Sequence, residues 1–426
     1  MKKTDLQPVK GARDFTPNNF AKRQWLFDQM IASAASFGFE QYDSPVLESI
    51  ETYKTKTSSE LVDEQSYRFK DRGDREVTIR PEMTPVLARM IAGNQNNLSF
   101  PIKWFSIPVL WRYEKPQSGR LREHFQWNVD VIGSDEQISD ADCIAVLCTF
   151  FQKIGLGPDK IKVHLNDKKD LQSDIEKWTG IDPKNQTLIL KFIDRLPKIG
   201  VANTISDIKQ NYPRVKDIEG FINYLNAANT NLSGNLKALF ENLKSLKLDD
   251  YIVIDRKIVR GLDYYTSTVF EVFPTDINSR AVAGGGRYDN LVGQFSDRKL
   301  TGVGFGMGDV VIGNLLEKYD LYPKNLNSHK KLLIAALSNN ALPKTLAMSQ
   351  KIREKNPNLI TSFYPQMSQM RDILSYGVKN EFNFLLIVGD KELSEDKYTL
   401  RELNSGHQTT DRKGAILNQI KQLSKK

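Results

Sequence analysis

Alternating polar and apolar residues near position 120 form the clearest pattern in the chain. Two such runs flank a loop that contains Pro116 and Gly119, which predicts a β-hairpin within residues 102–133. Because strand side chains alternate between two faces, the second run separates into two sets. The apolar set is Phe125, Trp127, Val129 and Val131, and the polar set is Arg122, His124, Gln126, Asn128 and Asp130. We expect the apolar face to be core. The polar face carries more charged and amide groups than a solvated strand needs, which favours a small polar ligand.

The first run of the hairpin divides in the same way. It places Arg112 and Glu114 on one face, with Trp111 and Tyr113 on the other. The loop between the runs adds three polar residues, Lys115, Gln117 and Arg120. A cationic tip of this kind favours contact with a polyanion.

Hydrophobic periodicity predicts the elements around this hairpin. Apolar residues at helical spacing predict a helix over 18–37, and a second helix is expected near 135–154. Residues 65–80 are typical of a hairpin with a turn at Asp71–Gly73. Thr84 precedes a proline, which marks the start of another helix.

The chain is too long for one ordinary domain. A Lys-, Asp- and Asn-rich stretch of helical pattern interrupts the strands, and after a linker the pattern alternates between strand and helix, as in a small α/β domain. The predicted parts are a first core segment at 1–167, a helical insertion at 168–248, a second core segment at 249–318, a linker at 319–330 and a last domain at 331–426. We expect an α+β fold.

Composition adds little to this pattern. Hydrophobic residues make up 40% and charged residues 26%, and the net charge of +8 leans toward polyanionic partners such as nucleic acid. The two cysteines, Cys143 and Cys148, lie in an apolar run, which indicates buried thiols and excludes a disulfide framework. No apolar stretch reaches membrane-spanning length, and the N-terminus lacks a signal-peptide core, so we expect a cytoplasmic protein that does not bind membranes.

Four glycines, Gly302, Gly304, Gly306 and Gly308, alternate along one predicted strand face. Glycines in register mark the close approach of a ligand or of another backbone. A flat base or sugar lying on that face and tight sheet-on-sheet packing are equally good explanations from the sequence. Asp309, which follows, has the ordinary role of capping the next helix.

Two further clusters combine charge with aromatic or hydroxyl groups. The segment from Arg260 to Tyr265 suits a phosphate and a small ring, although by itself a turn arginine beside half-buried tyrosines is the favoured explanation. The segment from Arg80 to Thr84 offers a carboxylate for an ammonium group, or ordinary helix-capping chemistry. The run GGGRYD at 284–289 predicts a flexible turn, and it is neither a P-loop nor a dinucleotide fingerprint.

Taken in order, these segments closely resemble the histidyl-tRNA synthetase family of class II aminoacyl-tRNA synthetases. The resemblance rests on KGARDF (10–15), RPEMT (80–84), WRYEKPQSGRLREHFQ (111–126), RGLDYYTSTVFEV (260–272), GGGRYDNLV (284–292), VGFGMG (303–308) and KYTLRELNSGHQ (397–408). RGLDYYT and RPEMT are specific to histidyl enzymes, whereas the hairpin is a general class II feature. The resemblance implies an antiparallel class II catalytic sheet, a C-terminal anticodon-binding domain and a homodimer.

The resemblance also implies a two-step reaction. L-histidine and Mg-ATP give histidyl-adenylate and pyrophosphate, and the histidyl group then passes to the 3′ end of the cognate histidine tRNA. This chemistry requires ATP and Mg²⁺, aligned reactants, and cations where charge develops.

The family motifs imply a role for each matching residue. Arg112 and Arg260 are expected to act on the α-phosphate. The histidine substrate is expected to contact Glu82, Thr84, Gln126, Asp130, Tyr264 and Tyr265. Besides Arg112, ATP is expected to contact Glu114, His124, Gly304 and Gly306. Gln117 and Arg120 are expected to meet the acceptor end of the tRNA.

Three positions depart from the family pattern. His124 and Phe125 stand in the reverse of the usual order, which places a titratable ring beside ATP and predicts that ATP affinity changes as the ring titrates. Asp130 stands where bacterial members often carry the longer Glu. The arginine that usually follows the glycine strand is absent, since Val310 and Val311 occupy that turn.

Two other function classes remain open from the sequence. A non-catalytic paralogue, either a histidine-binding regulatory subunit or a tRNA-binding sensor, fits the missing arginine. The regulatory paralogue usually lacks the C-terminal domain and the RGLDYY segment, both of which this chain contains. A general nucleic-acid-binding protein explains only the charge.

Overall fold

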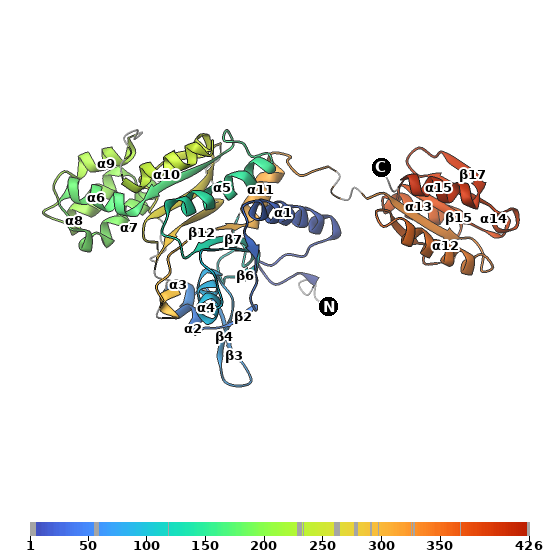
Figure 1. Cartoon of the computed structure of the whole chain (residues 1–426), viewed down its shortest axis with the longest axis horizontal. Helices are drawn as coiled ribbons and strands as arrows, with labels where there is room; N and C mark the ends of the chain where they lie inside the picture. The colour runs from blue at the N-terminus through green and yellow to red at the C-terminus, as the bar shows by residue number, and fades with distance from the viewer. Residues whose placement is uncertain are drawn as a thin grey trace. The chain divides into compact units, whose positions relative to one another are not determined.

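The computed structural model divides the chain into two compact units, Met1–Pro323 and Lys324–Lys426 (Figure 1). The structure describes residues 6–54, 59–117, 119–227, 232, 234–259, 265–276, 280–289, 292–296, 298–324, 326, 329–366 and 368–423. Each unit has its own apolar core and is described separately.

A large, mostly antiparallel sheet organises the first unit. Its spatial order is β1 (Glu40–Gln41), β5 (Ile102–Ser106), β7 (Glu123–Ile132), β12 (Gly302–Gly308), β11 (Ala283–Tyr288), β10 (Thr268–Pro274), β8 (Ile161–Asp167) and β9 (Ile252–Ile254). The short strand β6 (Val109–Trp111) pairs with β7 outside this path and forms the predicted hairpin. Only the outer pairs β1–β5 and β8–β9 are parallel. The sheet and its helices confirm the predicted α+β class.

One face of this sheet carries the main core. Trp127, Val129 and Val131 of β7 are buried there, as the alternation along the strand predicts. The helices packed on this face are α1 (Pro17–Ser36), α5 (Gln137–Lys153), α10 (Gly234–Ser245) and α11 (Asp309–Lys318) (Figure 1). The predicted core face of the second run is therefore confirmed for Trp127, Val129 and Val131.

Apolar side chains cover only one end of the opposite face. Helix α4 (Thr84–Asn94) packs there against Ile132 of β7 and Tyr288 of β11. A small sheet lies beside this helix, in the order β2 (Leu47–Ser49), β4 (Glu76–Ile79) and β3 (Tyr67–Lys70), together with α2 (Glu51–Lys54) and α3 (Ser59–Asp63) (Figure 1). The polar residues of β7 lie on the same face of the sheet as this covering.

A group of helices follows β8. These are α6 (Lys168–Thr179), η2 (Pro183–Asn185), α7 (Thr187–Ile199), α8 (Val201–Asn211) and α9 (Ile218–Asn226). Their apolar residues form a separate core, whereas those of α10 join the core beneath the large sheet. A 2.6 Å ion pair between Arg256 and Asp174, near η3 (Asp249–Tyr251) and β9, ties the group to the sheet. We retain the boundaries 168–248 of the insertion as a proposal.

The second unit is a five-stranded mixed sheet. Its order is β14 (Ile360–Phe363), β13 (Lys331–Ala336), β15 (Phe384–Val388), β16 (Lys397–Glu402) and β17 (Gln408–Arg412). The helices are α12 (Leu342–Lys355), α13 (Met370–Lys379), α14 (Asp390–Glu395) and α15 (Lys413–Leu423). Alternate residues of β13 are buried in two different clusters, so both faces of this sheet are covered. The predicted alternation of strand and helix is followed from β13 to β15, but the pattern did not indicate that β16 and β17 pair directly with each other without a helix between them.

The predicted turn at 284–289 is wrong, because most of these residues form β11 in the middle of the large sheet. A Cβ atom at Gly285 would lie 2.3 Å from the carbonyl oxygen of Gly304, and one at Gly286 would lie 2.4 Å from that of Thr268. The glycines therefore permit close strand packing and do not form a turn. Without side chains they provide no alternating pattern from which a strand is predicted.

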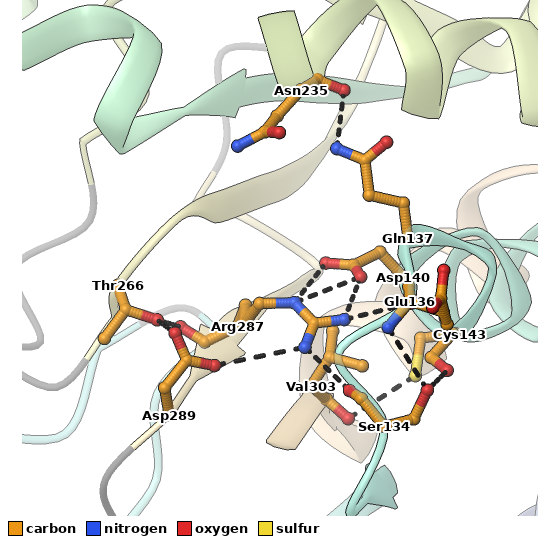
Figure 2. A network of polar contacts seen from close by, with 11 residues as sticks. Ser134, Glu136, Gln137, Asp140, Cys143, Asn235, Thr266, Arg287, Asp289 and Val303 are labelled. Atoms are coloured by element: carbon orange, nitrogen blue, oxygen red, sulfur yellow. Dashed lines mark hydrogen bonds and ion pairs between the residues drawn. The ribbon is translucent and has the colours of Figure 1, made fainter. Parts of the chain in front are cut away.

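A buried ion pair fixes β11 to the first turn of α5. Arg287 donates to the Asp140 carboxylate and, at 2.9 Å, to the Ser134 carbonyl oxygen (Figure 2). The Asp140 side chain is fully buried and that of Arg287 is 7% exposed. Removing Asp140 takes away the close carboxylate partner of the buried Arg287 and leaves the longer 3.9 Å contact with Asp289.

We therefore expect Asp140→Ala to lower the free energy of unfolding by about 3–5 kcal/mol in urea denaturation. The control is Asp142→Ala on the same helix. Asp142 bonds Lys103 at 2.6 Å, but both side chains remain about a quarter to a third exposed. Its loss is expected to cost less than about 1 kcal/mol. Equal losses in the two variants would contradict the assignment.

Candidate active site

The polar side chains of β7 lie over the glycine face of β12. In the antiparallel register, Asn128 pairs with Gly306 and Asp130 pairs with Gly304. A Cβ atom at Gly304 would lie 2.2 Å from Oδ1 of Asp130, and one at Gly306 would lie 1.9 Å from Nε2 of Gln126. The missing side chains of β12 thus leave room for the side chains of its neighbour. Packing against a second sheet does not explain these two glycines.

Asp130 is a buried carboxylate in the middle of this face. Its residue is 4% exposed, and Oδ1 accepts a hydrogen bond from the hydroxyl of Tyr288. Burial raises the pKa of Asp130 to about 7, although the Tyr288 hydrogen bond acts in the opposite direction. A carboxyl group with such a pKa changes charge near neutral pH, which is typical of functional sites.

The segment 80–84 lies against the start of the hairpin. The Trp111 amide donates to the Arg80 carbonyl oxygen at 3.1 Å, and Nε of Arg112 donates to the Pro81 carbonyl oxygen at 2.9 Å. Glu82, the next residue, is 7% exposed. Two motifs about thirty residues apart are therefore brought together, and Arg112 is held beside the carboxylate-bearing turn.

Helix α4 begins at Thr84 itself, with Met83 as its N-cap, so the predicted start differs by one residue. Thr84 is half-buried. The N-cap makes no side-chain hydrogen bond to the helix. Capping by Thr84 therefore does not account for its presence in the motif.

Arg80 has a structural role that the sequence did not predict. Its guanidinium group donates to Asp43 at 2.7 Å, and its Nε donates to the Val109 carbonyl oxygen at 3.0 Å. Arg80 is 2% exposed. It therefore joins the segment between β1 and β2 to β6. These partners are distant in sequence, so no local pattern could have indicated them.

At the tip of the hairpin, Arg120, a predicted tRNA ligand, contacts Glu114, the predicted adenine ligand. Gln117 and Arg120 exchange backbone hydrogen bonds of 2.9 Å, and Gly119 in the turn has a φ of +76°. The Arg120 side chain bonds the Glu114 carboxylate, whose side chain is 8% exposed. Gln117 accepts a 2.7 Å hydrogen bond from Arg280. The predicted adenine ligand and tRNA ligand are thus paired with each other.

His124 lies on the polar side of β7, opposite Phe125. Phe125 packs its ring against Phe15 and Phe27 on the helix side. Burial lowers the pKa of His124 to about 3, and the guanidinium groups of Arg112, Arg13 and Arg120 act in the same direction. The ring is therefore neutral near neutral pH, and a change of ATP affinity with its titration stays a prediction for acidic pH.

The turn that lacks the family arginine is apolar toward the hairpin tip. A Cβ atom at Gly119 would lie 3.2 Å from Cγ2 of Val311. The arginine that reaches the first turn of α11 is Arg13, which bonds Asp309 at 2.8 Å. Asp309 also accepts a 2.9 Å hydrogen bond from the amide of Phe125. Asp309 thus links α11, the N-terminal segment and β7. Its expected capping role is wrong, because Gly308 is the N-cap of α11 and no side-chain hydrogen bond caps the helix.

A cavity of about 300 Å³ lies between the segment that leads into α1 and helix α11. Lys22 and Arg23 line it together with Phe15, Asp309 and Glu317. Phe125 separates this region from the polar side of β7, because its ring packs beside Arg23. The cavity is therefore distinct from the polar face, and we do not place the substrate in it.

Of the remaining predicted site residues, the structure describes Tyr265 but not Arg260 or Tyr264. Tyr265 is 6% exposed, and a Cβ atom at Gly286 would lie 2.7 Å from its ring, so the tyrosine lies over β11. Arg260 and Tyr264 lie outside the described residues.

Within the described part of the chain, no group of three His, Cys, Asp or Glu side chains could hold a metal ion. A search of the described helices finds none both long and apolar enough to span a membrane.

The sequence matches one family over most of its length. Residues 11–308 match the family model described as Histidyl-tRNA synthetase. A curated "Histidine--tRNA ligase" of Leptospira biflexa is 36% identical over 99% of this chain and 98% of its own length. The "Histidine--tRNA ligase, chloroplastic/mitochondrial" of Arabidopsis thaliana is 32% identical over 96% of this chain and 85% of its own length.

Solved structures show the same fold. Histidyl-tRNA synthetase from Nostoc sp. PCC 7120 superposes with a TM-score of 0.78 over 98% of each chain, at 21% identity. The S. aureus histidyl-tRNA synthetase superposes with a TM-score of 0.73, at 22% identity, over 98% of this chain and all of the other. The predicted class II sheet is confirmed by these matches.

The raised pKa of Asp130 predicts a pH-dependent effect of Asp130→Asn on stability. The folded state binds the Asp130 proton more tightly than the unfolded state, so the carboxyl group destabilises the fold as pH rises from about 4 to about 7. Asparagine has no such charge. We expect thermal unfolding to show a stability gain of up to ~4 kcal/mol above about pH 7, and little change near pH 4. A gain or loss that does not vary with pH would argue against a buried, uncompensated carboxylate.

Proposed function

The chain belongs to the histidyl-tRNA synthetase family, and we infer that it acts as a histidine–tRNA ligase. The observation that carries this function is the match to curated ligases over nearly the whole chain, at 36% identity for the Leptospira relative. A regulatory or tRNA-binding paralogue explains this match less well, because the relatives share both units of the chain.

We propose that the reaction follows two displacements. A carboxylate oxygen of L-histidine attacks the α-phosphorus of ATP, and the bond to the bridging oxygen breaks, so that pyrophosphate leaves with the electron pair. A ribose hydroxyl at the 3′ end of the tRNA then attacks the histidyl carbonyl carbon, and AMP leaves. We propose Mg²⁺ as the metal. Bound together with ATP, it would supply positive charge that offsets the charge of the departing pyrophosphate.

Arg112 is proposed to hold the α-phosphate during the first displacement. Its Nε bond to the Pro81 carbonyl oxygen supports this role, because it fixes the side chain before the substrate arrives. A fixed guanidinium stabilises the charge that develops on the phosphoryl oxygens. Arg260, which lies outside the described residues, is proposed as the second cation on the strength of its motif alone.

The histidine substrate is proposed to lie on the polar side of β7. The residues proposed to contact it are Glu82, Thr84, Gln126, Asp130, Tyr264 and Tyr265. The positions of Asp130, on the polar side of β7, and of Glu82, in the turn that Arg112 contacts, support this proposal. The α-ammonium group suits Glu82 and the imidazole suits Asp130.

The adenine ring is proposed to bind between Glu114 and His124, and Gly304 and Gly306 stay predicted ATP contacts, since the side chains of Asp130 and Gln126 lie over them. The neutral, half-buried imidazole of His124 suits stacking better than a charged ring would. For Glu114 to meet the adenine, its contact with Arg120 has to open. We propose that Arg120 and Gln117 then become available to the acceptor end of the tRNA.

Three wider features are also proposed. The second unit is assigned to anticodon binding, and the chain to a homodimer, because both are expected of the family. A cytoplasmic location stays a prediction. The buried, unpaired thiols of Cys143 and Cys148 agree with a reducing compartment.

Histidine-dependent ATP–pyrophosphate exchange tests the proposed function directly. We expect exchange with histidine and with no other proteinogenic amino acid. Arg112→Ala is expected to lower the exchange rate by about 10²-fold or more, the usual effect of removing a group that stabilises transition-state charge. Arg75→Ala, at an exposed ion pair in the β3–β4 turn, is the matched control and should leave the rate unchanged. Exchange supported by a different amino acid would refute the ligase assignment.

A further inference from the structure

Tyr288 reaches diagonally across the sheet to Asp130. Tyr288 pairs with Gly302 and Asp130 pairs with Gly304, so one glycine-rich strand separates the two residues. A Cβ atom at Gly302 would lie 2.4 Å from Cε2 of Tyr288. The absent side chain therefore lets the tyrosine ring lie flat over β12, and its hydroxyl reaches Oδ1 of Asp130. Both residues are at most 4% exposed.

The other groups that face Asp130 do not neutralise it. Tyr42, from the segment after β1, and Cys143, from α5, both lie within electrostatic range. Neither is a cation, and in the described part of the chain Tyr288 is the one hydrogen-bond donor found for this carboxylate. The pairing strands add no charge, because Trp104 of β5 and Gly304 of β12 are its register partners. Asp130 is therefore held by one neutral donor.

We propose that Tyr288 is a positioning residue for histidine selection, holding the Asp130 carboxylate ionised and in place for the imidazole of the substrate. This inference rests on the proposed function, which places histidine at Asp130. A single hydroxyl bond on Oδ1 fixes the carboxylate plane, and Oδ2 is left for the substrate. Tyr288 itself acts through Asp130 and needs no contact with the ligand.

Burial and the Tyr288 hydrogen bond shift the pKa of Asp130 in opposite directions. Burial raises the pKa of Asp130 to about 7, and the Tyr288 hydrogen bond lowers it toward the ordinary range. An ionised carboxylate accepts an imidazole N–H, whereas a protonated one cannot pair with the imidazolium form. The KM for histidine should therefore fall as pH rises through about 7. Loss of the hydroxyl raises the Asp130 pKa further and moves this transition to higher pH.

The test is the KM for histidine in ATP–pyrophosphate exchange, measured for the full chain from about pH 6 to about pH 9. For Tyr288→Phe we expect the KM transition to move up by roughly one to two pH units, the shift that matches losing a hydrogen bond to a charged group. KM should rise roughly tenfold near neutral pH and recover at the alkaline end, with kcat little changed. Titration of histidine itself is common to both proteins, so the difference between the profiles isolates Asp130.

Tyr42→Phe is the matched control, because it removes a buried hydroxyl near Asp130 for which the described residues show no bond to that carboxylate. Its profile should coincide with the wild-type one. Asp130→Asn should show a raised KM whose pH dependence is that of free histidine alone. A Tyr288→Phe profile that is unchanged, or raised equally at every pH, would overturn the inference.

The two proposals fail in different ways. If the wild-type chain shows no histidine-dependent exchange, the proposed function fails. If the wild-type chain uses histidine but the KM profile of Tyr288→Phe has the same pH dependence as the wild-type profile, only the positioning role fails. A far-UV circular dichroism spectrum and unfolding midpoint for each variant identify loss of fold. If Tyr288→Phe does not fold, Tyr288→Trp repeats the test: its indole N–H lies at a different distance from Asp130, so the KM profile is expected to shift in the same direction. Failure of both variants to shift the profile would count against the inference.

Discussion

The absence of side chains along one face of β12 is the constraint on which the candidate site depends. Gln126 and Asp130 from one neighbouring strand and Tyr288 from the other occupy that space, each within a distance that a Cβ atom on β12 would forbid. The glycines thus allow three polar side chains to lie flat on the sheet. This arrangement brings residues from β7 and β11, distant in sequence, to one surface.

The polar side of the sheet is incompletely compensated in its present state. Asp130 is buried with one neutral donor, and His124 is half-buried near three guanidinium groups that disfavour its charged form. The surroundings of Asp130 and of His124 both lower the stability of the fold, and neither residue is needed to build the sheet. The buried Arg287–Asp140 pair on the α5 side is, by contrast, extensively hydrogen-bonded. The difference supports a structural role for one polar cluster and a ligand role for the other.

Sequence patterns predicted much of this architecture, and the failures have physical causes. Strand alternation placed Trp127 and Val129 in the core because one face of β7 is buried and the other polar. The same logic failed at β11, since glycines carry no side-chain pattern. Tyr113 was expected on a core face but is 55% exposed, with the Arg122 guanidinium 4.1 Å from its ring centroid. The hairpin beyond the sheet lacks a core to enforce alternation.

Site contacts between distant residues were the other gap. Bonds such as Arg13 to Asp309 and Arg80 to Asp43 join segments whose spacing in the chain is unrelated to their spacing in the fold. Resemblance to the family supplied roles for individual residues that periodicity alone could not supply. It did not indicate that Glu114 and Arg120 are partners before any ligand binds.

The most direct measurement of the central claim is a crystal structure of the chain with histidyl-adenylate bound. The account predicts an imidazole nitrogen within hydrogen-bonding distance of Asp130, with the Tyr288 hydroxyl still on the other carboxylate oxygen. It also predicts that Arg120 has left Glu114, which then faces the adenine. A histidyl group bound away from the polar side of β7, with the Glu114–Arg120 contact intact, would contradict the account.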